Sequence, residues 1–135
     1  LFTLNKSDCK LRKVERLSSR TVIKDVFEHG EQIFLFPFKV FYQPNIYEYN
    51  RVLISIPKKT HKKAITRNLL KRRIKEAYRQ NPQRNGTNSK FDIIFLYISG
   101  TVSDFNKIQK KLTYVLGKIQ ENSTDSDLAA IADSD

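Results

Sequence analysis

The segment from Phe91 to Ile98 is almost continuously apolar, and it constrains the fold more than any other part of the chain. A strand that faces water on one side alternates polar and apolar residues, whereas a strand buried on both faces does not. We therefore expect this segment to be the central strand of a sheet that is covered on both faces. With 135 residues, of which 39% are hydrophobic, the chain has enough material for about one such domain.

A short helix is predicted ahead of the first strand, after a basic arm over residues 1–13. Ser18 or Ser19 is a suitable N-cap, and apolar residues at helical spacing continue to about His29. Gly30 follows directly, and glycine is the residue type that most often ends a helix. The pattern therefore predicts an amphipathic helix that stops at this glycine.

Two strand regions, 33–43 and 51–57, are predicted between this helix and the next one. Pro37 interrupts the first region, so it indicates an edge, a bulge or a break into two strands. Thr66 is a suitable N-cap for a second helix that reaches about Asn81, where a proline follows.

The chain is predicted to end in a helix and an acidic tail. Residues 83–90 are rich in Gly, Asn and Ser and indicate a loop, and Ser103 is expected to cap the last helix. Residues 122–135 are acidic and Ser-rich, which is typical of disorder, so the domain is expected over residues 1–121. Helices that flank one small mixed sheet make an α+β sandwich, in the order α-β-β-β-α-β-α when the first strand region breaks.

Five aromatic residues crowd the first strand region. Phe34, Phe36 and Phe38 fall on one side of a continuous strand and are expected to pack in the core. Phe41 shares the other side with Lys39 and is the better surface candidate, since aromatic rings with basic neighbours can stack on unpaired bases.

The positive charge is concentrated in one quarter of the chain. The whole chain has 25 Lys+Arg against 14 Asp+Glu, a net charge of +11. Residues 51–84 hold twelve basic residues and one acid, Glu76, whereas the last fifteen residues hold five acids and no base. Such a density on a folded domain indicates a polyanionic partner, and nucleic acid is the leading candidate.

The helix predicted from Thr66 carries much of this charge on its outward face. The residues of that face are Arg67, Asn68, Lys71, Arg72, Lys75 and Arg79. Like charges four residues apart destabilise an isolated helix, and one acid among twelve bases leaves almost no internal pairing. Since Arg and Lys suit phosphate, the face is predicted to bind a polyanion.

The sequence of residues 57–79, PKKTHKKAITRNLLKRRIKEAYR, resembles the protein subunit of bacterial ribonuclease P. It has the Lys-Lys pair, the apolar step and the Arg-Asn pair of that family ahead of a Lys-Arg helix, although Leu69 replaces the second arginine of the Arg-Asn-Arg signature. Three other segments resemble the family in the same order: 13–30, 51–59 and 91–98. The similarity covers roughly residues 11–120.

The resemblance implies a ribosomal protein S5 domain 2-like fold with a left-handed β-α-β crossover around the basic helix. It also implies a subunit of a cytoplasmic ribonucleoprotein that removes the 5′ leader of precursor tRNA. The partners are then ribonuclease P RNA and precursor tRNA. The RNA is expected to catalyse the cleavage and to hold Mg²⁺, so that no side chain of this chain is catalytic or ligates metal.

Two binding surfaces follow from the resemblance, residue by residue. A cleft for the 5′ leader is expected to involve Phe27, Phe41 and Ser55. The surface for the catalytic RNA is expected to involve the Lys-Lys pair and the basic helix, to which the charge pattern adds Arg79: Lys58, Lys59, Thr66, Arg67, Asn68, Lys71, Arg72, Lys75 and Arg79.

Two other classes of function fit parts of the sequence. A protein-only nuclease would use His29 or His61 as general base, but its metal would need clustered carboxylates and the basic region has only Glu76. A non-catalytic RNA-binding module such as a ribosomal protein fits the composition, whereas the order of the motifs favours ribonuclease P.

Three absences in the sequence bear on its setting. No apolar run is long enough to span a membrane, and no signal peptide is expected from the first residues of the sequence. The single cysteine, Cys9, excludes an internal disulfide and is expected to be an inert thiol in a reducing compartment.

Overall fold

One four-stranded mixed sheet organises the chain. The computed structural model describes residues 15–81 and 90–133, and side chains as far as Glu121; the predicted arm, with Cys9, and most of the predicted loop over 83–90 lie outside these residues. The elements are α2 (Arg20–His29), β1 (Glu31–Leu35), β2 (Phe38–Asn45), β3 (Arg51–Ser55), α3 (Ala64–Arg79), β4 (Lys90–Tyr97) and α4 (Phe105–Asp133). The predicted α-β-β-β-α-β-α order is confirmed.

The strands lie in the order β1-β2-β4-β3, so β1 and β3 are the edges. β4 pairs antiparallel with β2 and parallel with β3. The parallel strands β3 and β4 are joined through α3, which is the β-α-β unit that the resemblance implies; its left-handed sense stays a prediction.

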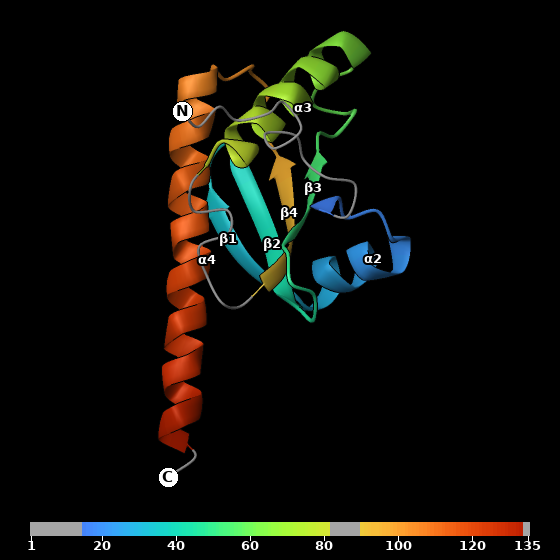
Figure 1. Cartoon of the computed structure of the whole chain (residues 1–135). Helices are drawn as coiled ribbons and strands as arrows, with labels where there is room; N and C mark the ends of the chain where they lie inside the picture. Colours follow the sequence, from blue (N-terminus) through green and yellow to red (C-terminus); the bar gives the residue numbers. More distant parts are fainter. Residues whose placement is uncertain (1–14, 82–89, 134–135) are drawn as a thin grey trace, which may run out of the picture.

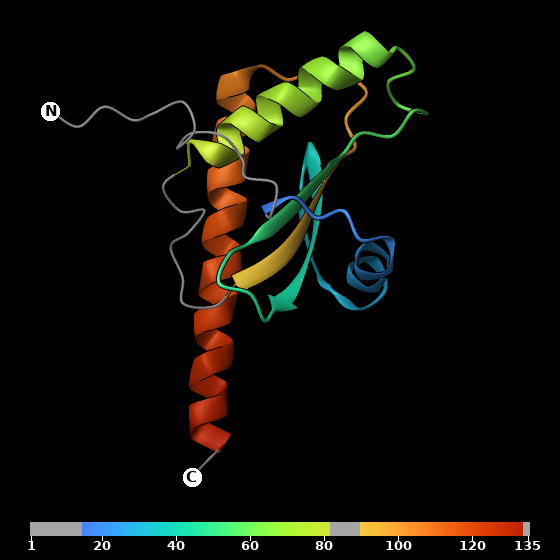
Figure 2. The same cartoon turned by 45° about the vertical axis from the view of Figure 1, so that its right-hand side comes forward.

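Helices cover both faces of the sheet, as the apolar β4 requires. α3 and α4 lie on one side and α2 lies on the other (Figures 1 and 2). Ile93 and Phe95 of β4 pack in the larger core with α3 and α4, whereas Ile94 packs with Val26 of α2 and Phe41 of β2. Alternate residues of one strand therefore enter two cores, and this explains the absence of alternation in the sequence.

The first strand region is a tight hairpin rather than one long strand. Phe36 and Pro37 form the turn, with a cis peptide bond between them, and Leu35 pairs with Phe38. Phe34 therefore pairs with Lys39 and lies on the face opposite to Phe38. Phe38 is buried as predicted, but the predicted burial of Phe34 and Phe36 is wrong, since both side chains are at least half exposed.

One of the three predicted helix caps is confirmed. The Ser19 hydroxyl accepts a hydrogen bond from the Val22 N–H at 3.4 Å, whereas α3 begins at Ala64, so Thr66 lies inside its first turn and is not the cap. Ser103 is not the cap of α4 either, because it is buried against the Tyr97 hydroxyl. Asp104 replaces it and accepts a hydrogen bond from the Lys107 N–H at 2.8 Å.

The last helix extends further than predicted. The sequence predicts disorder from residue 122, but α4 continues to Asp133 and runs past the end of the sheet (Figure 1). Residues 122–133 contain neither Pro nor Gly, and the segment from Leu128 to Ala132 consists of helix-compatible residues, so nothing in the sequence breaks the helix. The domain boundary at residue 121 stays a prediction.

Close packing, and not a left-handed backbone, requires a glycine at the end of α2, where Gly30 lies. Its φ is −73°, but a Cβ on this residue would lie 2.5 Å from the Val26 carbonyl oxygen and 2.9 Å from the Tyr42 carbonyl oxygen. We expect Gly30→Ala to lower the free energy of unfolding by about 1–3 kcal/mol, measured by urea denaturation. Gly100→Ala is the matched control, since a Cβ there meets nothing within 4 Å; equal effects of the two changes would contradict this explanation.

Candidate nucleic-acid interface

The basic helix α3 is held against the sheet by one apolar stripe. Leu70, Ile74, Ala77 and Tyr78 are buried in the larger core with residues of β2, β4 and α4. This anchoring leaves the opposite side of the helix in solvent. The helix therefore has the orientation that the sequence predicts, with its cationic residues outward.

Three of the outward cations of α3 are available to a ligand. Lys71 and Arg72 are exposed and Lys75 is half-buried, and none of them makes an ion pair within residues 15–81 and 90–121. The one acid of this region, Glu76, is taken by the side chains of Arg79 and Gln80. Asn68 is also exposed, one turn ahead of Arg72.

Two predicted RNA contacts, Arg67 and Arg79, have partners inside the protein. Arg67 Nη1 donates to the carbonyl oxygens of His61, at 2.9 Å, and Lys62, at 2.8 Å. Arg79 is mostly buried and forms an ion pair with Glu76. The Arg67 guanidinium thus stabilises the loop before α3 and the Arg79 guanidinium the last turns of α3, and only the remaining donors of these groups can face a ligand.

The loop between β3 and α3 is anchored by a buried histidine. His61 is 7% exposed, and its Nε2 donates to the Ser99 carbonyl oxygen at 2.8 Å. Together with Arg67 this bond fixes a loop on which Lys58 and Lys59 remain exposed. Because the carbonyl oxygen can only accept, Nε2 carries a proton and cannot act as a general base from this position.

The other histidine considered for catalysis, His29, lies on the opposite side of the sheet from α3. Its Nδ1 is 2.8 Å from Asp25 Oδ1, and the Gln43 amide donates to Asp25 Oδ2 at 3.0 Å. The Gln43 hydrogen bond, followed by the one from His29, lowers the pKa of Asp25. These groups tie α2 to β2 and do not meet the basic helix.

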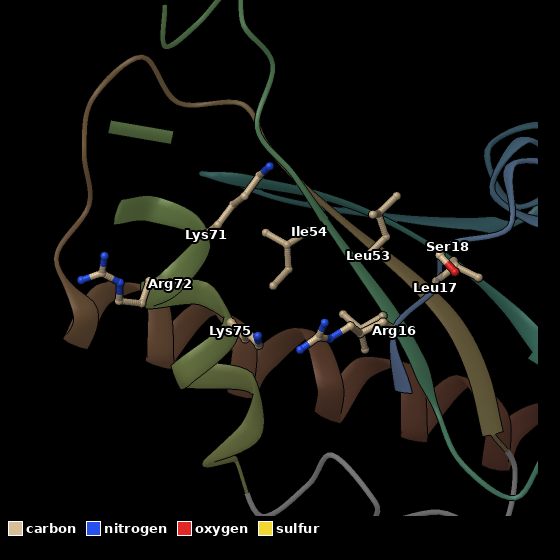
Figure 3. Close-up of a pocket in the computed structure, with 9 residues that line it drawn as sticks. Arg16, Leu17, Ser18, Leu53, Ile54, Lys71, Arg72 and Lys75 are labelled. Carbon is tan, nitrogen blue, oxygen red and sulfur yellow. The ribbon is translucent and has the colours of Figure 1, made fainter. Parts of the chain in front are cut away.

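A groove runs between α3 and the edge strand β3. It has a volume of about 590 Å³; we call it the α3 groove, and it is lined by Arg16, Leu17, Ser18, Val52, Leu53, Ile54, Lys71, Arg72 and Lys75. Figure 3 shows Ile54 between Lys71 and Arg16, with Lys75 beside them. Apolar side chains at the centre and cations around them suit a nucleic-acid strand, whose bases are apolar on their faces and whose phosphates are charged.

Arg16 is a cation of this groove that the sequence analysis did not select. It precedes α2, far from α3 in sequence, and a parallel bridge to Val52 holds it at the edge of β3. The Leu17 N–H also donates to the Val52 carbonyl oxygen at 2.9 Å. No local pattern signals this pairing, because it depends on which edge of the sheet the segment reaches.

On the other face of the sheet, α2 and β2 bring two predicted leader residues together. The Phe27 and Phe41 rings are 4.8 Å apart in an edge-to-face contact, and Lys39 Nζ is 5.5 Å from the Phe41 ring centroid. Ser55 lies on the same face, in the row of residues that contains Lys39 and Leu96. Since a cleft for the leader is predicted here, we call this surface, of Phe27, Phe41, Lys39, Leu96 and Ser55, the α2 cleft.

Burial changes the roles of the aromatic residues in the α2 cleft. Phe41, expected at the surface, is only 6% exposed and packs in the smaller core, whereas Phe27 is 37% exposed. Phe34 is 68% exposed and pairs with Lys39, so it extends the same face. The continuous strand that the sequence predicts would place Phe34 in the core, whereas the turn at Pro37 moves it to this face.

The described residues offer no metal site. None of residues 15–81 and 90–121 belongs to a group of three or more His, Cys, Asp or Glu side chains that could hold an ion. Mg²⁺ requires oxygen ligands such as carboxylates, and the acid nearest to the basic residues is already paired. The donor set of this face therefore does not fit a magnesium ion and instead fits anions.

Comparisons with known proteins agree with this geometry. The family model of ribonuclease P matches residues 11–120. The chain is 30% identical over 128 residues to the ribonuclease P protein component of Porphyromonas gingivalis, which covers 87% of this chain and 92% of that protein. It is 40% identical over 70 residues to that of Petrotoga mobilis, covering 52% of this chain and 58% of that protein.

Solved structures show the same fold. The RNase P protein from Thermotoga maritima superposes with a TM-score of 0.67 and 28% sequence identity, covering 77% of this chain and 96% of that one. The family model of ribonuclease P matches most of the chain, and the relatives are matched over most of their length. The chain therefore belongs to the ribonuclease P protein family.

Proposed function

We propose that this chain acts in ribonuclease P through two RNA-binding surfaces, the α3 groove for the catalytic RNA and the α2 cleft for the 5′ leader. As a family member, the chain is a protein subunit of ribonuclease P, and its partners are ribonuclease P RNA and precursor tRNA. The activity is endonucleolytic 5′ maturation of tRNA, with catalysis by the RNA. The proposal concerns which residues do the binding.

The observation that carries the proposal is the unpaired cationic side of α3. Lys71, Arg72, Lys75 and Arg16 converge on one groove without an acid to neutralise them among the described residues. A protein keeps such a face only at a cost in electrostatic repulsion, and phosphates relieve this repulsion. Lys58 and Lys59, on the anchored loop next to α3, extend the same surface.

The α2 cleft has the composition expected for an unpaired strand. Phe27 presents an exposed ring, and Lys39 supplies a positive charge next to Phe41, the ring that Phe27 contacts. Aromatic rings bind single-stranded RNA by stacking and tolerate any base, which suits leaders of different sequence.

Mg²⁺ enters this scheme as an ion held by the RNA. The cations of α3 act by neutralising phosphates, so that the RNA fold and its substrate come together at lower ion concentrations. No helix within the described residues is both long and apolar enough to cross a membrane. We place the particle in the cytoplasm, where precursor tRNA is made in bacteria.

Reconstitution tests the proposed function directly. The protein is added to a bacterial ribonuclease P RNA at a magnesium concentration too low for the RNA alone, and removal of the 5′ leader is measured. We expect cleavage only when both components are present. Cleavage by the protein alone, lost in His61→Ala, would instead identify a protein-only nuclease.

With the same reconstituted particle, measurement of tRNA affinity tests the α2 cleft. Phe27→Ala should weaken binding of precursor tRNA about tenfold and leave binding of mature tRNA unchanged, because one stacked base contributes about 1–3 kcal/mol. Phe27 is preferred over Phe41 because truncation of a buried ring would also damage the core. Phe27→Tyr is the matched control and should bind both tRNAs as the wild type does. Equal losses for the two tRNAs in Phe27→Ala would remove the leader from the α2 cleft.

A further inference from the structure

A second basic groove lies between α4 and the edge strand β1. It has a volume of about 480 Å³; we call it the α4 groove, and it is lined by Leu35, Lys107, Lys110, Lys111 and Tyr114. Four of these residues occupy positions i, i+3, i+4 and i+7 of α4 and so share one side of the helix. Neither the charge pattern of residues 51–84 nor the family motifs include any of them.

The lysines of the α4 groove have no acidic partner among the residues whose side chains are described. Of the nearest acids along the helix, Asp104 accepts a hydrogen bond from the Lys107 backbone N–H and forms no ion pair with a described side chain, and Glu121 pairs with Lys118 at 3.8 Å. Three like charges within two turns repel one another, so a bound anion is expected to stabilise this side of the helix.

An exposed aromatic ring adjoins these charges. Tyr114 is 53% exposed, and Lys118 Nζ lies 5.9 Å from its ring centroid. Leu35, at the end of β1, supplies an apolar side chain to the groove. A ring, an apolar contact and three cations are the elements with which proteins bind single-stranded nucleic acid.

The α4 groove is separate from both surfaces described above. It lies at β1 and the α3 groove lies at β3, and these strands are the two opposite edges of the sheet. The α2 cleft lies on the other face, since α2 and α4 cover opposite sides of the sheet (Figure 2). One short RNA strand therefore does not fill all three surfaces.

We propose that the α4 groove is a second binding site for ribonuclease P RNA, in which the three lysines contact phosphates and Tyr114 stacks on an unpaired base. The inference rests on the proposed function in one respect, that the chain binds this RNA. The catalytic RNA is preferred over the leader because the groove is on the same side of the sheet as α3. A protein partner is disfavoured, since lysine is depleted in protein interfaces.

The test compares variants of the full chain that differ only in charge or ring. Lys107→Ala, Lys110→Ala and Lys111→Ala are combined, and the matched control combines Lys107→Arg, Lys110→Arg and Lys111→Arg. Affinity for ribonuclease P RNA is measured as a function of salt. Three lost contacts to a single strand should lower the slope of log affinity against log salt by about 2, and the affinity about 10- to 50-fold near physiological salt. The arginine variant should retain both values.

Tyr114 gives a second, independent measurement. We expect Tyr114→Ala to lower the affinity for ribonuclease P RNA about tenfold at all salt concentrations, since stacking carries no net charge, and Tyr114→Phe to bind like the wild type. Thermal unfolding of each variant, whose changed side chains are at the surface of α4, should match the wild type.

The outcomes separate this inference from the proposed function. Wild-type affinity in the triple alanine variant, together with a loss when α3 is neutralised, would overturn the α4 site and leave the proposed function intact. Wild-type affinity in the triple alanine variant and also in the variant with α3 neutralised would contradict the α4 site and the proposed function together. If the triple alanine variant lost affinity only for precursor tRNA, or only for vesicles that contain phosphatidylserine, the groove would have another occupant and the inference would be overturned.

Discussion

Replacing Lys71, Arg72 and Lys75 together with alanine should weaken binding to ribonuclease P RNA by about 50- to 200-fold near physiological salt. These are the cations of α3 that line the groove and have no ion pair within the described residues. Three lost phosphate contacts should also lower the slope of log affinity against log salt by about 2–3, because fewer counterions are released. Both values come from one salt titration of the affinity.

The matched control keeps the charge and changes only its shape, with Lys71→Arg, Arg72→Lys and Lys75→Arg combined. It should retain most of the affinity and the full salt slope. Arg67 is left unchanged in both variants, because its removal would free the carbonyl oxygens of His61 and Lys62 and confuse a folding effect with a binding effect. An unchanged slope in the alanine variant would show that RNA does not bind the α3 groove.

Replacing Asp92 with alanine should lower the free energy of unfolding by about 3–5 kcal/mol, the largest loss of stability that we expect from one substitution. The Asp92 side chain is 3% exposed and forms two hydrogen bonds of 2.7 Å with the Arg51 guanidinium, which raises the pKa of Arg51. The Asn45 amide donates to the same carboxylate at 2.9 Å. Removal of the carboxylate leaves a mostly buried cation without its partner, and urea denaturation measures the cost.

The comparison that isolates this effect replaces both partners, Arg51→Met with Asp92→Leu. The double variant should be more stable than Asp92→Ala, since neither side then leaves a buried charge. Glu28→Gln, which removes an exposed carboxylate 3.9 Å from Lys24, should change little. A loss in Asp92→Ala as small as that in Glu28→Gln would mean that water already screens the pair.

Local patterns predicted the elements of this fold better than their pairing. The helix from Ser19 to Gly30 and the apolar strand β4 were predicted because their signals lie within a few neighbouring residues. The caps at Thr66 and Ser103 were wrong because tertiary contacts decide them: Arg67 holds the turn before α3, and the Tyr97 hydroxyl binds Ser103. Capping by a side chain contributes only about 1 kcal/mol, which such contacts can override.

The residues of the candidate site that are placed by helical spacing could be predicted from the sequence. Those that are placed by strand pairing in the sheet could not. Lys71, Arg72 and Lys75 lie outward as the pattern predicts. Arg16 and Phe34 reach their surfaces only through strand pairing, with β3 in one case and across the hairpin in the other, so neither could be placed from its neighbours in sequence.

The anchoring of the loop between β3 and α3 has a consequence for the kinetics of assembly. His61 and Arg67 hold the backbone of this loop before any RNA arrives. Ordering a free loop on binding costs about 1–2 kcal/mol for each residue fixed, and here folding of the protein has already met that cost. The chain therefore presents its Lys-Lys pair in a preformed arrangement, and binding of RNA requires no conformational search by this loop.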